Sequence, residues 1–382
     1  MQKTGNNYLS WHGTIYNSDI VRACITPKVK AVGKLVPKHI RETTDADGNK
    51  DIVVNPSPAI RMLLERPNPL MSGMQFREKM ATQLCINSNA FALIQRDPMG
   101  NAIAMYPIAP TSAQAIYSDS GELSLRFTMP NGKLITASYS DIIHLRQNYN
   151  ENDIFGTPIA PVLTPLLDVV TTTDQGVINA IKNSSVIRWL LKFTNAMRPE
   201  DLKKNAKDFA DSFLATSEGT GVAAVDAKAD ATQISPSDFV PNAAQMDRTT
   251  QRIYALFNTN EHIVTSSYTE DEYGAYFDAE IEPVEIDLAT ELTYKLFSAR
   301  EIAFGNRIVL EAEAWDSAST KTKLSLVSMV DRGGLTVNEW RAAFNLSPLP
   351  GGDTPIRRLD TQPTDGTGDD ADKNSEEGGS AD

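Results

Sequence analysis

Between Ala90 and Leu145 the chain reads AFALIQRDPMGNAIAMYPIAPTSAQAIYSDSGELSLRFTMPNGKLITASYSDIIHL. Short apolar and β-branched runs recur in this stretch, and Gly100-Asn101, Gly121 and Asn131-Gly132 separate them. Such spacing is typical of strands joined by tight turns. The predicted strands are Phe91 to Ile94, Ala104 to Tyr106, Leu123 to Phe127, Leu134 to Ile135 and Ile142 to Leu145. We therefore expect an antiparallel meander here.

Helical patterns lie on both sides of this β-rich stretch, where apolar residues recur every three or four positions. The predicted helices are 19–36 with a break near Pro27, 58–66, one capped by Ser72, one through Leu163 to Ile181, one opening at Pro199, one through Met246 to Phe257, and one from Pro283 to Phe304. Thr336 and Glu339 can form a capping box ahead of Trp340, which predicts a further helix start. Strands are also expected at 186–193 and 308–315, with a hairpin at 222–235. Together these patterns predict an α+β fold with at least two packed regions.

Composition limits the classes of function. The 382 residues carry a net charge of −13, which argues against a protein that grips nucleic acid through a basic surface. From Asp360 onward eight acidic residues stand against Lys373 alone, so we expect a disordered acidic tail. The chain has neither an apolar run of about 18 residues nor a signal-peptide pattern, so we expect no membrane span.

Motifs for catalysis or cofactor binding are missing or misplaced. Gly219 to Ala224 fits the dinucleotide pattern G-x-G-x-x-A, but it follows a predicted helix and precedes a predicted strand, the reverse of the order that pyrophosphate binding needs. No G-x-x-x-x-G-K-[ST] loop is present, and the four histidines stand singly without metal-ligand spacing. Cys24 and Cys85 lie in apolar surroundings, which favours buried thiols over a disulfide. We expect no catalytic residue, no metal site and no cofactor.

Several phrases occur in an order that is found in one family of viral proteins. They are Arg66 to Pro69, Asn87 to Ala92, Arg96 to Gly100, Tyr106 to Pro110, Asp141 to Leu145, Phe155 to Pro158, and Gly334 to Arg341 with Pro348, Gly351, Gly352 and Asp353. From about residue 15 to residue 353, this succession resembles that of the HK97-type bacteriophage portal family. The chain departs from the pattern at Ser88, where the family commonly has Gly, and at 258–266, which lacks the Gly and Pro often found there.

The resemblance implies a dodecameric ring at the portal vertex of the virion capsid, assembled in the host cytoplasm, through which DNA is packaged and ejected. The implied partners are further copies of the chain, double-stranded DNA, the large terminase, the major capsid protein and head-tail connector proteins, with no membrane partner. The motor's ATPase would be a separate protein, and the ring itself no enzyme. Carried onto this chain, the family's parts are a wing at 1–157 and 278–320, stem helices at 158–185 and 241–263, a clip at 186–240, a tunnel loop at 264–277, a crown at 321–355 and the disordered tail at 356–382.

Two sets of residues are candidates for contacts in such a ring. The stretch SSYTEDEYGA, residues 266–275, is polar and acidic, so we expect a loop, and the resemblance makes it the tunnel loop. Its channel-lining candidates are Ser266, Ser267, Tyr268, Glu270, Asp271, Glu272 and Gly274. The three acidic residues among them would repel DNA phosphate and so weaken adhesion of DNA to the channel. Lys203, Lys204 and Lys207 form a basic face of the predicted clip helix, either an ordinary solvated face or a contact for an acidic packaging or tail protein.

Two other functions stay open at this point. One is another capsid-associated assembly factor, and the other is a soluble hydrolase that uses Asp or His in the β-rich half.

Overall fold

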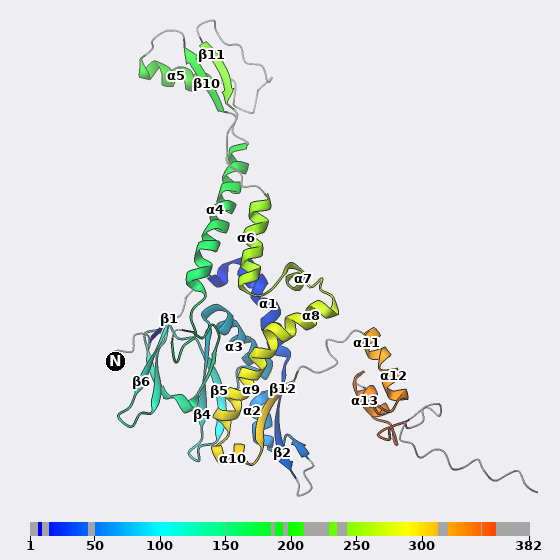
Figure 1. Ribbon diagram of the computed structural model, residues 1–382. Coiled ribbons are helices and arrows are strands. Elements are labelled where there is room, and N and C mark those ends of the chain that lie inside the picture. The colour runs from blue at the N-terminus through cyan, green and yellow to red at the C-terminus, as the bar shows by residue number, and fades with distance from the viewer. Residues whose placement is uncertain are drawn as a thin grey trace, which may run out of the picture. The chain divides into compact units, whose positions relative to one another are not determined.

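The computed structural model describes residues 7–9, 15–44, 50–150, 152–184, 188–193, 198–209, 229–234, 243–311, 320–344 and 346–356. Contacts divide the chain into a first unit, residues 1–10, 25–157 and 261–382, and a second unit, residues 11–24 and 158–260. Helices and small antiparallel sheets occur in both units (Figure 1). The predicted α+β class is therefore confirmed.

The strands between residues 89 and 146 are antiparallel but form two sheets rather than one meander. β4 (Asn89–Arg96) lies between β5 (Ala102–Ile108) and β9 (Ile142–Arg146). The second sheet has the order β1 (Asn7–Leu9), β6 (Ser112–Tyr117), β7 (Leu123–Thr128) and β8 (Leu134–Ser138). The prediction of a simple meander is wrong in this pairing, and it missed β6.

Burial explains why β9 returns to β4. Both strands are buried on both faces, whereas β6 and β7 alternate between buried and more exposed positions. Phe91 of β4 packs with Leu125 and Phe127 of the second sheet, while Ala92 and Ile94 face the helices of the first unit. A strand with apolar neighbours on both sides belongs in the middle of the fold.

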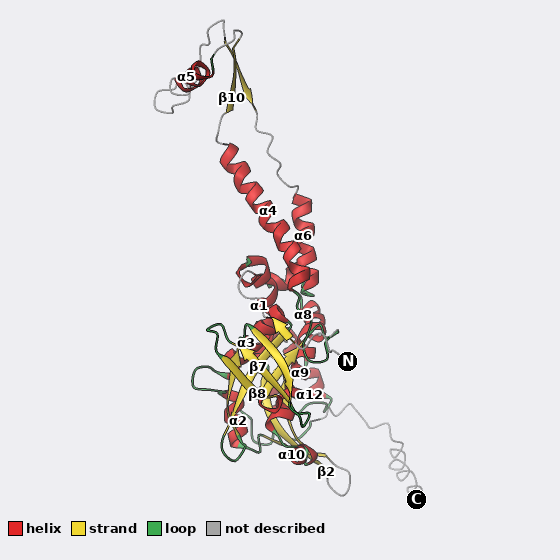
Figure 2. Cartoon of the chain, turned by 90° about the vertical axis from the view of Figure 1, so that its left-hand side faces the viewer, coloured by secondary structure: helices red, strands yellow, loops and turns green. Residues whose placement is uncertain are grey.

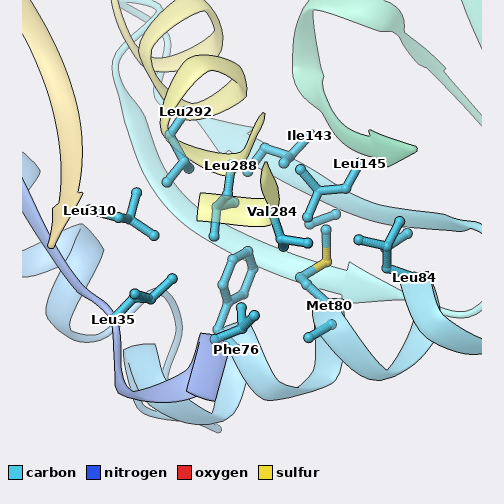
Figure 3. Close-up of a cluster of buried hydrophobic side chains, with 14 of the residues drawn as sticks. Leu35, Phe76, Met80, Leu84, Ile143, Leu145, Val284, Leu288, Leu292 and Leu310 are labelled. Atoms are coloured by element: carbon cyan, nitrogen blue, oxygen red, sulfur yellow. The ribbon is translucent and has the colours of Figure 1, made fainter. Parts of the chain in front are cut away.

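The largest core of the first unit lies between α3 (Gly73–Asn87) and α9 (Glu282–Leu296). Figure 3 shows Phe76 and Met80 of α3 pointing toward the side chains of α9, with Leu84 further along α3 near Leu145. The buried residues that α9 contributes are Val284, Leu288, Leu292 and Leu296, spaced one helical turn apart. Ser72 begins α3 with a capping box to Gln75, as the sequence predicts a cap there.

Several boundaries differ from the sequence predictions. α1 (Asp19–Lys34) continues through Pro27, because Cys24 and Val32 on either side stay buried on its inner face and outweigh the missing donor. The long helix α9 ends at Leu296, and Ser298 caps a separate α10 (Ala299–Ala303) through Glu301. Both cysteines are buried free thiols, as expected.

The remaining elements of the first unit complete a third sheet and a C-terminal group. β12 (Asn306–Glu311), β2 (Val36–Thr44) and β3 (Lys50–Val54) pair in that order, and α2 (Pro58–Glu65) and η2 (Tyr139–Asp141) are short helices.

The C-terminal helices are α11 (Thr320–Ser325), α12 (Val327–Asp331) and α13 (Val337–Ala342). α13 begins with the predicted Thr336–Glu339 capping box. The acidic tail prediction falls on residues beyond 356 that lie outside the described ones.

A buried hydrogen-bond network ties the start of β4 to residues 147–156. The Asn89 side chain donates to the Gly156 carbonyl (2.9 Å) and accepts from the Gly156 amide (2.9 Å). Its Oδ1 also lies 3.1 Å from His144 Nε2, so this nitrogen carries the proton and donates. Tyr139 Oη lies 3.3 Å from His144 Nδ1. Burial lowers the pKa of His144 well below its usual value, so the ring is a neutral group that packs inside the fold.

The outer edge of β9 is completed by carboxylates of α9. The His144 amide donates to Glu291 Oε2 (3.3 Å), and the Arg146 amide donates to Asp287. Residues two apart on a strand and four apart on a helix are separated by about 6 to 7 Å along each element. The two carboxylates therefore match the two amides and stand in for a neighbouring strand.

In the second unit, α4 (Ala160–Ser184) and α6 (Ala243–Leu256) lie side by side (Figure 2). η1 (Ile15–Asn17) belongs to this unit as well. β10 (Arg188–Phe193) pairs with β11 (Ala229–Ile234), and α5 (Pro199–Phe209) opens at Pro199 as predicted. The second half of the predicted 222–235 hairpin is thus β11 paired with β10, and its first half lies outside the described residues. No helix in the described part of the chain is long and apolar enough to cross a membrane.

Candidate functional site

The segment predicted as a loop at 264–277 is largely helical. α7 (Glu261–Val264) precedes it, α8 (Glu270–Tyr276) occupies its second half, and a π-helical turn, η4 (Phe277–Ile281), joins α8 to α9. Thr269 Oγ1 accepts from the Glu272 amide (3.3 Å), while Glu272 Oε2 accepts from the Thr269 amide (2.8 Å). This is a capping box, so the loop prediction is wrong over residues 270–277. The sequence signal was Thr269 with Glu272 three positions later.

Glu272 is held on both of its carboxylate oxygens. Its Oε1 lies 2.8 Å from His262 Nδ1. Hydrogen bonding and charge from Glu272 raise the pKa of His262, and the Thr269 amide followed by His262 lowers the pKa of Glu272. Sequence reasoning missed His262 here because ten residues separate the two partners. Of the predicted acidic lining, Glu272 is therefore a structural residue of the cap.

Glu270 and Asp271 are exposed in the first turn of α8, where carboxylates favour the helix dipole. Asp278, in the π-turn, is also exposed and extends this acidic surface. Sequence reasoning missed it. Gly274 lies inside α8 without a positive φ, so the helix does not require glycine at this position.

The polar residues before α8 form a compact turn. Ser266 takes the left-handed conformation, with φ of 59°. The Ser267 amide donates to the His262 carbonyl (2.9 Å), and the exposed Tyr268 ring stacks on Tyr273 at 5.0 Å. The structure thus brings together all seven predicted channel residues in one stretch, with Ser266, Ser267, Tyr268, Glu270 and Asp271 exposed.

The three predicted clip lysines lie on α5. Lys203, Lys204 and Lys207 are all exposed. Glu200 and Asp201 occupy the first turn of α5, and Lys207 lies in its last, which suits the helix dipole. The face is basic and exposed to solvent in the chain. Among the described residues, no group of three His, Cys, Asp or Glu side chains is placed to hold a metal ion.

The chain matches a known protein family along most of its length. A model of the phage portal protein family matches residues 19–345, which include parts of both units. The chain belongs to the phage portal protein family. The resemblance drawn from the sequence phrases is therefore confirmed.

Individual portal relatives are distant in sequence. The portal protein of Enterobacteria phage HK97 is 22% identical over 345 residues, covering 86% of this chain and 78% of that protein. The probable portal protein of Lactococcus phage p2 is 27% identical over 187 residues, covering 45% of this chain and 48% of that protein.

Solved portal and neck structures share the fold. A chain from the neck of the native gene transfer agent particle, computed with C12 symmetry, gives a TM-score of 0.63 at 12% identity, covering 88% of this chain and 92% of that one. An HK97 family phage portal protein from Corynebacterium diphtheriae gives a TM-score of 0.52 at 9% identity, covering 82% and 98%. The portal fold thus persists where few residues are identical.

Proposed function

We propose that the chain is the portal subunit of a phage capsid, twelve copies of which form the ring through which DNA is packaged and ejected. The family match over residues 19–345 carries this proposal. A chain of the same fold in a particle neck computed with C12 symmetry supports the ring and its number of copies. The ring has no catalytic role, and a separate terminase supplies the ATPase.

Within this proposal the parts keep the boundaries expected from the family. Residues 1–157 and 278–320 are the wing, 158–185 and 241–263 the stem, 186–240 the clip, and 321–355 the crown. The division of contacts between residues 157 and 158 supports the start of the stem, whereas residues 11–24, counted in the wing, group with the second unit, and the second division falls at 260/261. The major capsid protein surrounds the ring, and terminase and then head-tail connectors dock on the clip.

The segment 264–277 faces the DNA in this proposal. Its exposed carboxylates, Glu270 and Asp271, would repel phosphate and let DNA slide. Replacing both with Lys should strengthen DNA adhesion and slow packaging most at low salt, because each added cation releases counterions from DNA. Glu272 is left unchanged, since it caps α8. The measurement is packaging rate over a salt series with intact rings.

A matched control places two lysines on a different exposed turn. Asp119 and Glu122 lie in the turn between β6 and β7 and are also exposed. Their replacement with Lys gives the same change of charge and should leave packaging at the wild-type rate. Equal packaging by the Glu270/Asp271 variant at every salt concentration would place the segment away from DNA.

The clip lysines are proposed to contact acidic surfaces of terminase or connector proteins. Changing Lys203, Lys204 and Lys207 to Gln should weaken binding of these partners, and the loss should shrink as salt rises. The control changes Lys30, Lys34 and Lys133 to Gln, which are exposed lysines of the first unit. Equal partner affinity for both triple variants, measured by surface plasmon resonance, would leave the clip lysines as a solvated face.

A further inference from the structure

The helix from Glu270 to Leu296 contains one turn that is wound differently from the rest. In η4 the Glu282 amide donates to the Phe277 carbonyl, five residues back rather than four. One extra residue in a turn rotates the preceding part of a helix by about 100° relative to the following part. Tyr276 and Ile281, five residues apart, are accordingly both buried, at 7% and 0% exposure. In an uninterrupted α-helix, Phe277 would take the place of Tyr276.

A buried ion pair meets this turn. Lys28 Nζ of α1 lies 2.6 Å from Glu280 Oε2, and each side chain is only 11% exposed. A pair buried to this degree favours the geometry in which its two members meet. α1 belongs to the second unit up to Cys24 and to the first unit from Ile25, so Lys28 lies within one turn of that change.

The other end of α8 is fixed in the same register. The Thr269 cap and His262 both hold Glu272, as described above. If α8 turned by about 100° around its axis, the local Thr269 cap would turn with it, whereas Glu272 would move away from His262 on α7. The ion pair of His262 therefore reports the register of α8, although Lys28 and His262 bind different carboxylates.

We propose that the helix 270–296 has two registers and that the Lys28–Glu280 ion pair selects the one with the π-turn. In the second register the π-turn becomes α-helical, Phe277 replaces Tyr276 against the core, and α8 advances by one residue. Glu270 and Asp271 then turn by about 100° around the helix axis. A shift of α1 acts on this equilibrium through Lys28. The exchange is a property of the chain and does not depend on whether residues 264–277 face DNA.

The test uses the full chain and reads the register at His262, away from the mutated pair. Exchange of the imidazole Cε1 hydrogen, followed by mass spectrometry over a pH series, gives the pKa of His262. In wild type this pKa is raised by Glu272. In Lys28→Met it should fall toward the ordinary value, because the contact with Glu272 is lost while Glu261 remains nearby, and the amides of residues 269–282 should exchange roughly tenfold faster or more. Lys28→Met with Glu280→Gln, which leaves no buried charge, should behave in the same way.

Two further variants decide the outcome. Lys38→Met breaks an exposed pair of the same 2.6 Å length, to Glu311, and should change neither readout. Deleting Ala279 removes the extra residue of the π-turn. When this deletion is combined with Lys28→Met, the raised pKa of His262 should be restored. The proposal is overturned if His262 keeps its raised pKa in both Lys28 variants, if Lys38→Met lowers it equally, or if the deletion restores nothing.

Discussion

At the scale of single residues, the structure gives a physical reason for two of the sequence phrases shared with the portal family. Asn89 pairs with Gly156 through both backbone groups, so the phrase Asn87 to Ala92 and the phrase Phe155 to Pro158 meet in one buried contact. A Cβ at Gly156 would lie 2.2 Å from the Gln147 carbonyl oxygen and 2.5 Å from that of Ser88. Ser88 itself takes φ of 55°, in the left-handed region that favours Gly.

This contact predicts a coupled loss of stability. Asn89→Ala should lower the free energy of unfolding of the first unit by about 1 to 3 kcal/mol, because it strips buried groups of their partners. Gly156→Ala should also destabilise, through backbone crowding. The double variant should lose less than the sum, since both changes break one contact. The measurement is urea unfolding, with Asn131→Ala on an exposed turn as the control. Strictly additive losses would show that the residues act separately.

At the scale of elements, α9 acts on β9 as a neighbouring strand would. Glu291 and Asp287 accept from the amides of His144 and Arg146, and Lys295 Nζ, one turn further on, donates to the Tyr139 carbonyl (2.6 Å). Burial is the main cause that raises the pKa of Glu291 and Asp287 above their ordinary values. The helix therefore covers the edge of the sheet, and this costs free energy because the two carboxylates are partly removed from water.

Substitution of Glu291 separates its acceptor role from its charge. Glu291→Leu should destabilise the first unit by about 1 to 3 kcal/mol, because the His144 amide loses its partner. Glu291→Gln keeps an acceptor oxygen and should lose less. Because the pKa of Glu291 is raised in the folded state, its contribution to stability is fully present below the ordinary pKa of a glutamate. This contribution is lost as the pH rises through the raised pKa. Unfolding measured over a pH series should thus show a shallower decline above about pH 4.5 in Glu291→Gln. An unchanged slope would contradict this assignment.

How much of each element could be predicted depended on whether the signal was local. Ser72, Pro199 and Thr336 begin helices where predicted, because a cap is set by a few neighbouring residues. The equally local Thr269–Glu272 box was overlooked because the polar, acidic stretch around it looked like a loop. The π-turn and the partnership of Lys28 with Glu280 depend on contacts across 252 residues, and no sequence spacing indicates them.

At the scale of the whole molecule, sequence order was sufficient for the family and the α+β class but not for the pairing of strands. β9 pairs with β4 although β6, β7 and β8, which belong to another sheet, lie between them in the sequence. This pairing forms because both strands carry apolar side chains on both faces. Periodicity alone does not distinguish that arrangement from a meander. The channel and clip candidates were located by resemblance, and their roles in a ring depend on neighbouring copies of the chain.

Electron microscopy of the purified chain tests whether twelve copies form a portal ring. We expect closed rings with a central opening, and a twelvefold ring at one vertex of assembled capsids. Such rings should persist in the Glu270/Asp271 and clip-lysine variants, whose changes lie on exposed positions of the chain. A chain that stays monomeric at micromolar concentration and is absent from the capsid vertex would contradict the claim.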